Sequence, residues 1–434
     1  MGIKIQSHDL TGRHDWASLV KIVKPSGIEG ALTAPPSKSM MQRAVAAAAL
    51  AHGSSVLLNP SFCEDALAAL GIAEGLGAEV SRESGKVRIK GGGQPKGHRL
   101  ACGESGLCMR LFAPIAALFD RSFTLTGRGS LVARPMGVLE EPLEALGARC
   151  QTHRGFPPVT VRGPIKGGRV SLDGSLSSQV ASGFLIALPL CPQDSVLTVA
   201  NLKSKPYLRM TLSLLKEFGI IIHHDEELRR FEIPGQQAYH PRTYRVEGDW
   251  SGGAFPLVAG AIAGRVKVRG LSDKSLQADR AILEALEKAG ARVCSEGNAV
   301  TVEQSRLEAF EFDATDCPDL FPPLVALACY CKGRSVIRGT ERLRHKESDR
   351  ALALVSEFRK MGARIRVQGG TMEVTGGRLK GGEVSSHQDH RIAMACAVAG
   401  LASEKGVRIR DWSCVGKSHP QFFDDLEALR RKGR

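Results

Sequence analysis

Ionisable side chains are unusually dense in the segment LRHKESDR, which runs from Leu343 to Arg350. It follows the apolar run of residues 324–330 and precedes another stretch with helical patterning. Cations grouped with one or two carboxylates are typical of sites that bind anions and transfer protons. A solvated charged loop is the alternative, because charge runs usually face water.

Further carboxylates and cations lie elsewhere in the second half of the chain. Asp313, Asp316 and Asp319 precede an expected helix. The tripeptide DHR from Asp389 precedes an apolar stretch, and Lys417 lies near the C-terminus. The three aspartates could bind a divalent cation, but they do not complete the calcium-loop pattern. We therefore expect no metal site, and an enzyme that binds anions and moves protons.

Four other segments place glycine, serine or charged residues directly before helix-like apolar stretches. They are PPSKSMMQR with Ser37, Lys38, Ser39 and Arg43, GESGLCMRL with Gly106 and Arg110, GSLSSQ with Ser177, Ser178 and Gln179, and EGDWSGG with Asp249 and Ser251. Backbone N–H groups at a helix start attract anions, and glycine lets a ligand approach. A capped helix explains any one segment, but four at equivalent places in a repeat predict anion-binding positions. The first lacks the GxxxxGK[ST] pattern of a nucleotide-binding P-loop.

A long-period repeat positions these segments. A helical stretch that ends at glycine and is followed by two strand-like runs recurs at Gly77, Gly147, Gly219, Gly290 and Gly362. These glycines are 70, 72, 71 and 72 residues apart, and one more step reaches Gly433. Apolar residues before each glycine share one helical face, so glycine is expected to end each helix in the left-handed conformation.

The repeat also predicts how the ends of the chain meet. A sixth helix is expected over residues 422–432, with no chain left to supply its two strands. Residues 19–32 are strand-like around a turn and have no helix before them, so we expect them to pair with the last unit. Six units divide into two domains of three, each within the usual domain size. A single solenoid is the alternative, but neither end has a polar capping repeat.

The overall composition limits the classes of partner. The formal charge of +14 fits either a nucleic-acid surface or pockets for small anions. Aromatic residues make up only 5% of the 434 residues, and no run of five or six basic residues occurs. Both features disfavour stacking on nucleic acid, so no nucleic-acid partner is expected.

Targeting segments are not evident in the sequence. No apolar run approaches the roughly eighteen residues of a membrane span, and residues 1–24 lack the apolar middle of a signal peptide. Eleven cysteines are scattered without a CxxC pair or metal-like spacing. We therefore expect no membrane association and a cytoplasmic location, where thiols stay reduced.

Eight short motifs together resemble signature segments of the 5-enolpyruvylshikimate-3-phosphate synthase family. They are PPSKSMMQR, SSQ from Ser177, SKPY from Ser204, EGDWS, the pair Pro318-Asp319, KESDR from Lys346, DHRIAMA from Asp389 and the terminal GKSHPQFF. The resemblance runs from about Lys21 to the C-terminus. It implies an α/β, two-domain enolpyruvyl transferase fold with three βαβαββ units in each domain and the active site in the cleft between them.

By the same resemblance the chain crosses between the domains near Pro35 and Gly248. One domain is then discontinuous, made of residues 1–35 and 249–434, and residues 36–248 form the other. The glycine spacing predicts the same number of units independently.

The resemblance further implies transfer of the enolpyruvyl group of phosphoenolpyruvate to the 5-hydroxyl of shikimate 3-phosphate, with release of phosphate, in the shikimate pathway to aromatic amino acids. This addition and elimination passes through an anionic tetrahedral intermediate and needs two proton transfers. Asp319 is expected to take the hydroxyl proton, and Glu347 or Lys38 to protonate the methylene carbon. The implied enzyme is a monomer that acts on two small molecules without cofactor or metal.

The family's binding residues map onto both halves of the chain. Phosphoenolpyruvate is expected at Lys38, Gly106, Arg134, Gln179, Arg350, Arg391 and Lys417. Shikimate 3-phosphate is expected at Lys38, Ser39, Arg43, Ser177, Ser178, Gln179, Ser204, Asp319 and Lys346. Because both domains contribute, we expect them to close around the substrates.

Several positions depart from the family's pattern. Many members have Asn and Thr where this chain has Glu104 and Leu107. They commonly have Asn at the positions of Arg342 and Gln42 in this chain, and an apolar residue at the position of His345. An acidic Glu104 beside bound phosphoenolpyruvate is unfavourable unless paired, so a cation is expected next to it. Arg342 either adds a phosphate contact or points outward. The retained Gly106 favours inhibition by glyphosate, to which this family is sensitive at the phosphoenolpyruvate site, whereas Leu107 argues against it, so both outcomes stay open.

Two other functions fit the same scaffold. The fold-sharing enzyme that transfers enolpyruvyl to UDP-N-acetylglucosamine typically uses a cysteine in a mobile loop, and the corresponding residues 120–134 contain none. A noncatalytic or nucleic-acid-binding protein would have no need of Asp319, Glu347 and the full set of cations.

Overall fold

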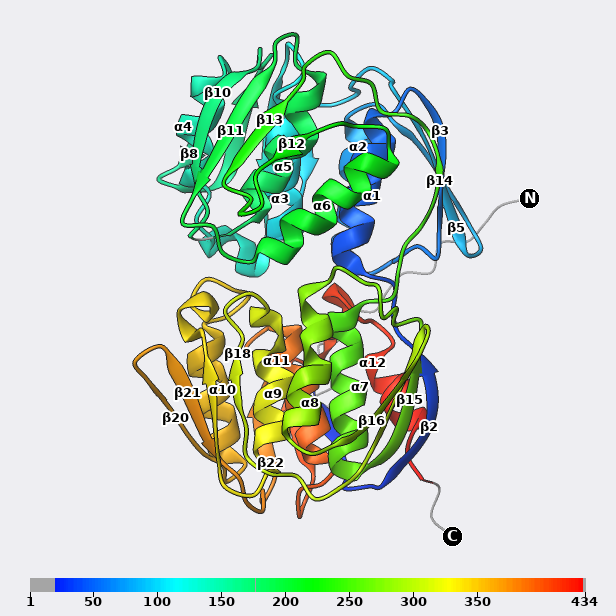
Figure 1. The fold of residues 1–434 in the computed structure, drawn as a ribbon, viewed down its shortest axis with the longest axis vertical. Helices are drawn as coiled ribbons and strands as arrows, with labels where there is room; N and C mark the ends of the chain where they lie inside the picture. The colour runs from blue at the N-terminus through cyan, green and yellow to red at the C-terminus, as the bar shows by residue number, and fades with distance from the viewer. Residues whose placement is uncertain (1–19, 176, 432–434) are drawn as a thin grey trace, which may run out of the picture.

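Two lobes, joined by two crossing segments, make up the molecule (Figure 1). The computed structural model describes residues 20–175 and 177–431. Buried apolar residues form two separate clusters, one from residues 40–246 and the other from residues 23–34 and 250–429. The crossing segments meet at an antiparallel bridge between Pro36 and Gly248. Residues 1–19 of the expected discontinuous domain, and Lys432 and Gly433 of its last unit, lie outside the described residues.

Five four-stranded sheets share one topology, in which a parallel pair of strands is extended by an antiparallel hairpin. In one lobe the sheets are, in spatial order, β14 (Thr243–Arg245), β3 (Gly53–Leu58), β5 (Lys86–Gly91) and β4 (Glu79–Glu83); then β6 (Arg99–Ala101), β7 (Ser122–Thr126), β9 (Phe156–Arg162) and β8 (Arg149–His153); then β10 (Gly168–Asp173), β11 (Ser195–Ala200), β13 (Arg230–Ile233) and β12 (His223–His224). In the other lobe they are β2 (Ile28–Thr33), β15 (Gly264–Arg269), β17 (Ala299–Glu303) and β16 (Arg292–Glu296); then β18 (Glu311–Asp313), β19 (Arg334–Arg338), β21 (Thr371–Thr375) and β20 (Arg364–Gln368). The repeat expected from the sequence is therefore confirmed.

The sixth sheet combines strands from the two ends of the chain. In it β22 (Gly382–Ser385) lies parallel to β23 (Val407–Arg410), and β1 (Val20–Val23) pairs antiparallel with β23. The expectation for residues 19–32 is therefore confirmed for β1, which joins the last unit, and wrong for β2, which pairs parallel with β15 in another sheet.

The last helix is shorter than expected. It is α12 (Phe422–Ala428), which ends before residue 432. The reason is a competing backbone pairing: Arg430 forms a bridge with Ile28, and the N–H of Arg431 donates to the carbonyl of Gly27 at 2.9 Å. These contacts draw the chain out of the helix and toward β2.

Helices fill the interior of each lobe, and the sheets cover them (Figure 1). The inner helices are α1 (Lys38–Leu50), α3 (Gly106–Ala116), α5 (Gln179–Ala187), α7 (Trp250–Ala263), α9 (Phe321–Ala328) and α11 (His390–Gly400). The remaining α-helices of the described residues are α2 (Glu64–Gly75), α4 (Glu140–Ala145), α6 (Lys205–Glu217), α8 (Ile282–Lys288), α10 (Arg350–Lys360) and α12. Small residues let the inner helices pack closely. A Cβ at Gly183 of α5 would lie 2.5 Å from the Arg110 carbonyl oxygen of α3.

Glycine ends the helix of each repeat as expected. Gly77, Gly147, Gly219, Gly290 and Gly362 have φ angles of 104°, 93°, 85°, 79° and 93°. Only glycine adopts this left-handed conformation without strain, so the chain can leave the helix and enter the hairpin.

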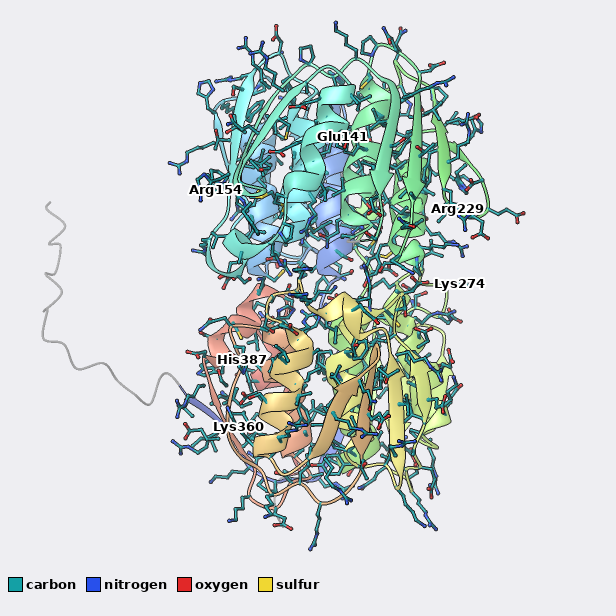
Figure 2. The ribbon with its side chains drawn as sticks, turned by 90° about the vertical axis from the view of Figure 1, so that its left-hand side faces the viewer. Glu141, Arg154, Arg229, Lys274, Lys360 and His387 are labelled. Carbon is teal, nitrogen blue, oxygen red and sulfur yellow. The ribbon has the colours of Figure 1, made fainter. Side chains whose placement is uncertain are left out.

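The outer surface of both lobes is strongly charged. Figure 2 shows side chains such as Arg154, Arg229 and Lys360 projecting into solvent. Among the described residues, no helix combines the length and the apolar character that a membrane crossing requires.

Candidate active site

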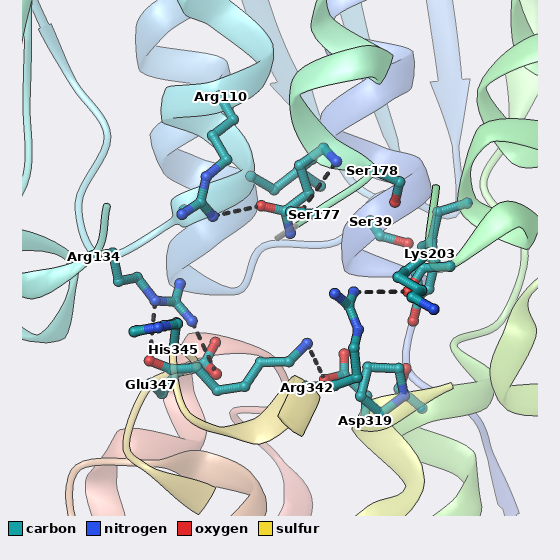
Figure 3. A pocket seen from close by; sticks show the side chains of 18 of the residues that line it. Ser39, Arg110, Arg134, Ser177, Ser178, Lys203, Asp319, Arg342, His345 and Glu347 are labelled. Carbon is teal, nitrogen blue, oxygen red and sulfur yellow. Dashed lines mark hydrogen bonds and ion pairs between the residues drawn. The ribbon is translucent and has the colours of Figure 1, made fainter. Parts of the chain in front are cut away.

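A cavity of about 510 Å³ lies between the two lobes (Figure 3). Each inner helix contributes a wall residue at or beside its start: Lys38, Gly106, Gln179, Ser251, Asp319 and Arg391. The first turn of a helix has unpaired N–H groups and the positive end of the helix dipole. Six such ends therefore converge on one space, which favours negatively charged ligands.

Most of the residues expected at the site lie in the wall of this cavity. They are Lys38, Ser39, Arg43, Gly106, Arg134, Ser177, Ser178, Gln179, Ser204, Asp319, Lys346, Glu347 and Arg391. Two expected residues, Arg350 and Lys417, lie behind the wall, with side chains 1% and 4% exposed. They reach the site through ion pairs with carboxylates.

Asp319 is surrounded by cations. Its Oδ1 is 3.3 Å from Lys346 Nζ and 2.7 Å from Arg350 Nη1, and its Oδ2 is 2.9 Å from Arg391 Nη2. Burial alone would raise the pKa of Asp319, but the charges of Arg391, Lys346 and Arg350 outweigh it and hold the pKa well below the usual range. Asp319 is therefore a carboxylate at neutral pH.

Glu347 shares one cation, Arg350, with Asp319. Its Oε2 is 2.5 Å from Arg350 Nη2 and 3.2 Å from Arg134 Nη2. Burial would raise the pKa of Glu347, but Arg350 and Arg134 lower it well below the usual range. Arg350 is fixed from behind by Asp389, whose Oδ2 accepts from Arg350 Nε at 2.8 Å.

Lys38 is paired with a carboxylate from the next helix. Its Nζ is 3.1 Å from Asp65 Oδ2, and both side chains are largely buried. Burial lowers the pKa of Lys38, but the charge of Asp65 more than compensates, so the pKa lies above its ordinary value. Lys38 is therefore an ammonium at neutral pH. Asp65 was not predicted, because an acidic residue in the first turn of α2 looks like an ordinary partner of the helix dipole.

Two buried arginines anchor the upper wall. Arg43 donates to Thr211 Oγ1 at 2.8 Å, and burial lowers its pKa to about 10. Arg110 donates to Gln179 Oε1 at 2.9 Å, and burial, assisted by Arg134, lowers its pKa to about 9. Both remain charged at neutral pH, so the wall stays positive.

Several hydrogen bonds connect the lobes across the cavity. Arg134 Nε donates to the carbonyl of Lys346 at 3.1 Å. Arg342 donates to Ser204 Oγ at 3.1 Å, and the N–H of Ser204 donates to Asp316 Oδ1 at 2.7 Å. Arg342 thus points into the cavity, which decides the question that its sequence position left open. The structure has the lobes closed on each other.

The other unusual positions also have defined places. Glu104 Oε2 lies 3.3 Å from Lys417 Nζ, so the cation expected beside Glu104 is confirmed. His345 and Leu107 line the cavity. Gln42 is buried away from it and accepts from Ser105 Oγ at 3.1 Å.

The fold and the cavity define the class of protein. The enolpyruvyl transferase NikO from Streptomyces tendae superposes with a TM-score of 0.76, over 95% of this chain and 97% of that one, at 17% identity. This similarity shows a shared enolpyruvyl transferase fold. The EPSP synthase from Acinetobacter baumannii superposes with a TM-score of 0.81, over 95% and 98% of the two chains, at 26% identity.

Sequence comparison identifies the family within this class. The EPSP synthase (3-phosphoshikimate 1-carboxyvinyltransferase) family model matches residues 22–426, and the chain belongs to this family. A 3-phosphoshikimate 1-carboxyvinyltransferase from Methanocorpusculum labreanum is 39% identical, covering 94% of this chain and 98% of its own. One from Aeropyrum pernix is 40% identical, covering 94% and 95%. The chain is thus a transferase of the shikimate pathway that acts on small-molecule substrates.

Proposed function

We propose that the cavity transfers the enolpyruvyl group of phosphoenolpyruvate to the 5-hydroxyl of shikimate 3-phosphate, with Asp319 as the base. One observation carries this assignment of roles. An ionised carboxylate, surrounded by Lys346, Arg350 and Arg391, lies where six helix starts converge. A base beside several cations suits a reaction between two anions in which a hydroxyl must lose its proton.

Shikimate 3-phosphate binds along the serines of the upper lobe. Its proposed contacts are Lys38, Ser39, Arg43, Ser177, Ser178, Gln179, Ser204, Asp319 and Lys346. Ser178 and Ser204 begin α5 and α6 without using their side chains as helix caps. Both hydroxyl groups lie in the cavity wall and can donate their protons to phosphate oxygens, next to two helix N-termini.

Phosphoenolpyruvate binds where the arginines of both lobes meet. Its proposed contacts are Lys38, Gly106, Arg134, Gln179, Arg350, Arg391 and Lys417. Gly106 leaves room for the two guanidinium groups beside it, because a Cβ there would lie 2.7 Å from Arg134 Nη1 and 3.1 Å from Arg110 Nη1. Guanidinium groups pair with carboxylate and phosphate in bidentate fashion, which suits both anionic ends of the substrate.

The addition step begins at Asp319. Phosphoenolpyruvate draws Arg350 and Arg391 toward its own oxygens, and the pKa of Asp319 rises as their charges are shared. The carboxylate then accepts the proton of the 5-hydroxyl while the hydroxyl oxygen bonds to C2 of phosphoenolpyruvate. The electron pair of the double bond takes a proton at the methylene carbon, which becomes a methyl group.

Lys38 supplies that proton. It is an ammonium at neutral pH, whereas Glu347 is already a carboxylate. Glu347 is consequently suited to the elimination, in which a proton leaves the methyl group, the double bond forms again and phosphate departs. The surrounding arginines stabilise the anionic intermediate and the leaving phosphate.

Residues 1–35 with 249–434, and residues 36–248, act as the two domains, in line with the two separate clusters of buried residues. We propose a monomer in the cytoplasm, with no nucleic-acid or membrane partner. The eleven cysteines are free thiols, nine of them buried. A reducing compartment suits such a set.

The decisive experiment measures phosphate release from phosphoenolpyruvate by the purified protein. Release is expected with shikimate 3-phosphate and not with UDP-N-acetylglucosamine, and mass spectrometry should find the enolpyruvyl ether of shikimate 3-phosphate. If phosphate is released only with UDP-N-acetylglucosamine, or is released with neither of the two acceptors, the proposal is wrong.

A further inference from the structure

An ion pair beside the cavity joins the two lobes at a second place. Glu104 lies in the turn before α3, and Lys417 is the last residue of the 3₁₀ helix η8 (Trp412–Lys417) in the other lobe. Lys417 Nζ is 3.3 Å from Glu104 Oε2 and 3.2 Å from Ser130 Oγ. The N–H and the hydroxyl of Ser130 donate to the same Glu104 oxygen, at 3.2 Å and 3.0 Å. The three residues form a closed triangle across the cleft.

Lys417 depends on this triangle for its charge to be buried. Its side chain is 4% exposed, and an ammonium removed from water without a counter-ion costs several kcal/mol. Burial would raise the pKa of Glu104, but Lys417 and the Ser130 hydrogen bonds lower it below the ordinary value, so the partner is ionised. The backbone is shaped for it as well, because a Cβ at Gly129 would clash with the Glu104 carboxylate.

We propose that Glu104 is a positioning residue that docks Lys417 when the lobes close and thereby favours the binding of phosphoenolpyruvate. The proposal rests on the role of Lys417 in the proposed function. In an open cleft both charges are hydrated. In the closed cleft Glu104 neutralises the buried ammonium before substrate arrives, so less of the substrate's binding free energy is spent on closure. An ammonium has three N–H donors, and the triangle uses two of them.

The opposite effect is the alternative. A carboxylate close to the site could simply repel anionic phosphoenolpyruvate, and its removal would then strengthen binding. Docking and repulsion predict changes of opposite sign, so the direction of the change decides between them.

Steady-state kinetics of Glu104→Gln provide the first test. Glutamine keeps the size and removes the charge, and we expect the KM for phosphoenolpyruvate to rise by about tenfold, equivalent to about 1.4 kcal/mol. The KM for shikimate 3-phosphate should stay within about twofold of the wild-type value. Glu104→Asp keeps the charge, so its KM for phosphoenolpyruvate should lie between those of the wild type and Glu104→Gln. An unchanged or lower KM for phosphoenolpyruvate in Glu104→Gln would overturn the proposal.

The matched control is Glu64→Gln. Glu64 approaches the same loop, since a Cβ at Gly416 would lie 3.1 Å from its Oε1, but it pairs with Arg128 of its own lobe at 3.6 Å. We expect this variant to retain the wild-type KM for phosphoenolpyruvate. A rise equal to that of Glu104→Gln would mean that any carboxylate near the loop has the effect, and docking by Glu104 would be wrong.

Hydrogen exchange gives a test that is independent of activity. Without substrates, the amides of residues 412–419 should exchange several-fold faster in Glu104→Gln than in the wild type or in Glu64→Gln, because undocking exposes η8. Equal exchange in all three proteins would overturn the docking of Lys417. Failure of the proposed function would appear differently, as a wild-type protein that releases no phosphate with shikimate 3-phosphate.

Discussion

In the proposed mechanism, Asp319 is the residue at which substrate binding and proton transfer are coupled. Lys346, Arg350 and Arg391 keep its pKa low, so with these ion pairs in place it is a weak base. The proposed function assigns the same three cations to the anionic substrates. On that proposal Asp319 becomes a stronger base as the substrates occupy these cations, so we expect the hydroxyl to be deprotonated only when both reactants are present.

Replacement of Asp319 by asparagine keeps the shape of the side chain and removes the base. We expect kcat to fall by roughly 10³-fold or more, because a positioned general base contributes about 10² to 10⁴ and the electrostatics of the cluster also change. Affinity for shikimate 3-phosphate should stay within a few-fold, since Arg43 and the serines of the upper lobe are untouched. Phosphate release measures the first quantity, and calorimetry the second.

The control for this variant is Asp313→Asn. Asp313 belongs to the same sequence cluster, yet it accepts from the Thr315 N–H at 2.9 Å and does not line the cavity. It should retain wild-type kinetics. Turnover of Asp319→Asn close to that of this control would contradict the role of Asp319.

Single residues differ in how far the sequence predicts their surroundings. The cation beside Glu104 was predictable, because a carboxylate near an anion site must be compensated by charge. The pairing of Lys38 with Asp65 was not, since it depends on how α1 packs against α2. For the same reason the direction of Arg342 required the structure, because it donates to Ser175 and Ser204, which belong to the opposite lobe.

At the scale of elements, the start of α11 connects helix stability to the site. Asp389 caps this helix by accepting from the Arg391 N–H at 3.0 Å. The same carboxylate accepts from Arg350 Nε at 2.8 Å and from Ser348 Oγ at 3.1 Å. Two helices and the buried Arg350 are therefore held by one side chain that is itself fully buried.

The variant Asp389→Asn separates these two tasks. Asparagine caps a helix as well as aspartate does, but the substitution removes one of the negative charges that surround the Arg350 guanidinium. We expect the free energy of unfolding to fall by about 2 kcal/mol, less than the 3–5 kcal/mol for loss of a sole buried partner, because Asp319 and Glu347 remain. Urea unfolding provides the measurement.

Asp349→Asn is the matched control, because Asp349 caps α10 by accepting from the Leu352 N–H at 3.2 Å and is less buried. It should change the free energy of unfolding by less than about 0.5 kcal/mol. Equal effects of the two substitutions would mean that capping alone, and not the charge next to Arg350, accounts for the stability.

Most elements were predictable, whereas among their distant partners only the pairing of β1 with the last unit was predicted. Glycine spacing and apolar periodicity are local signals, and they predicted the helix ends, the hairpins and the helix starts around the cavity. The pairing of β14 with β3, whose strands lie far apart in the chain, left no local signal. The end of α12 was likewise set by a backbone partner near Gly27.

At the scale of the whole molecule, the charges of the cavity wall oppose closure of the cleft. The cavity wall contains eight lysines and arginines against five aspartates and glutamates, a formal excess of three positive charges. Hydrogen bonds across the cleft, from Arg134 to Lys346 and from Arg342 to Ser204, favour closure. An anionic ligand adds the missing negative charge, so it should shift the equilibrium further toward the closed form.

Shikimate 3-phosphate is therefore expected to make the molecule more compact in solution. Small-angle X-ray scattering should show a lower radius of gyration at saturating ligand, and the difference should grow at low ionic strength, where repulsion in the empty cleft is least screened. Arg342→Ala should close less at the same degree of saturation, because it loses the hydrogen bonds to Ser175 and Ser204 while the rest of the wall remains. Equal concentrations of inorganic phosphate serve as the control for ionic strength. If saturating shikimate 3-phosphate leaves the scattering curve unchanged, the lobes are already closed without ligand, and charge in the cavity does not control their motion.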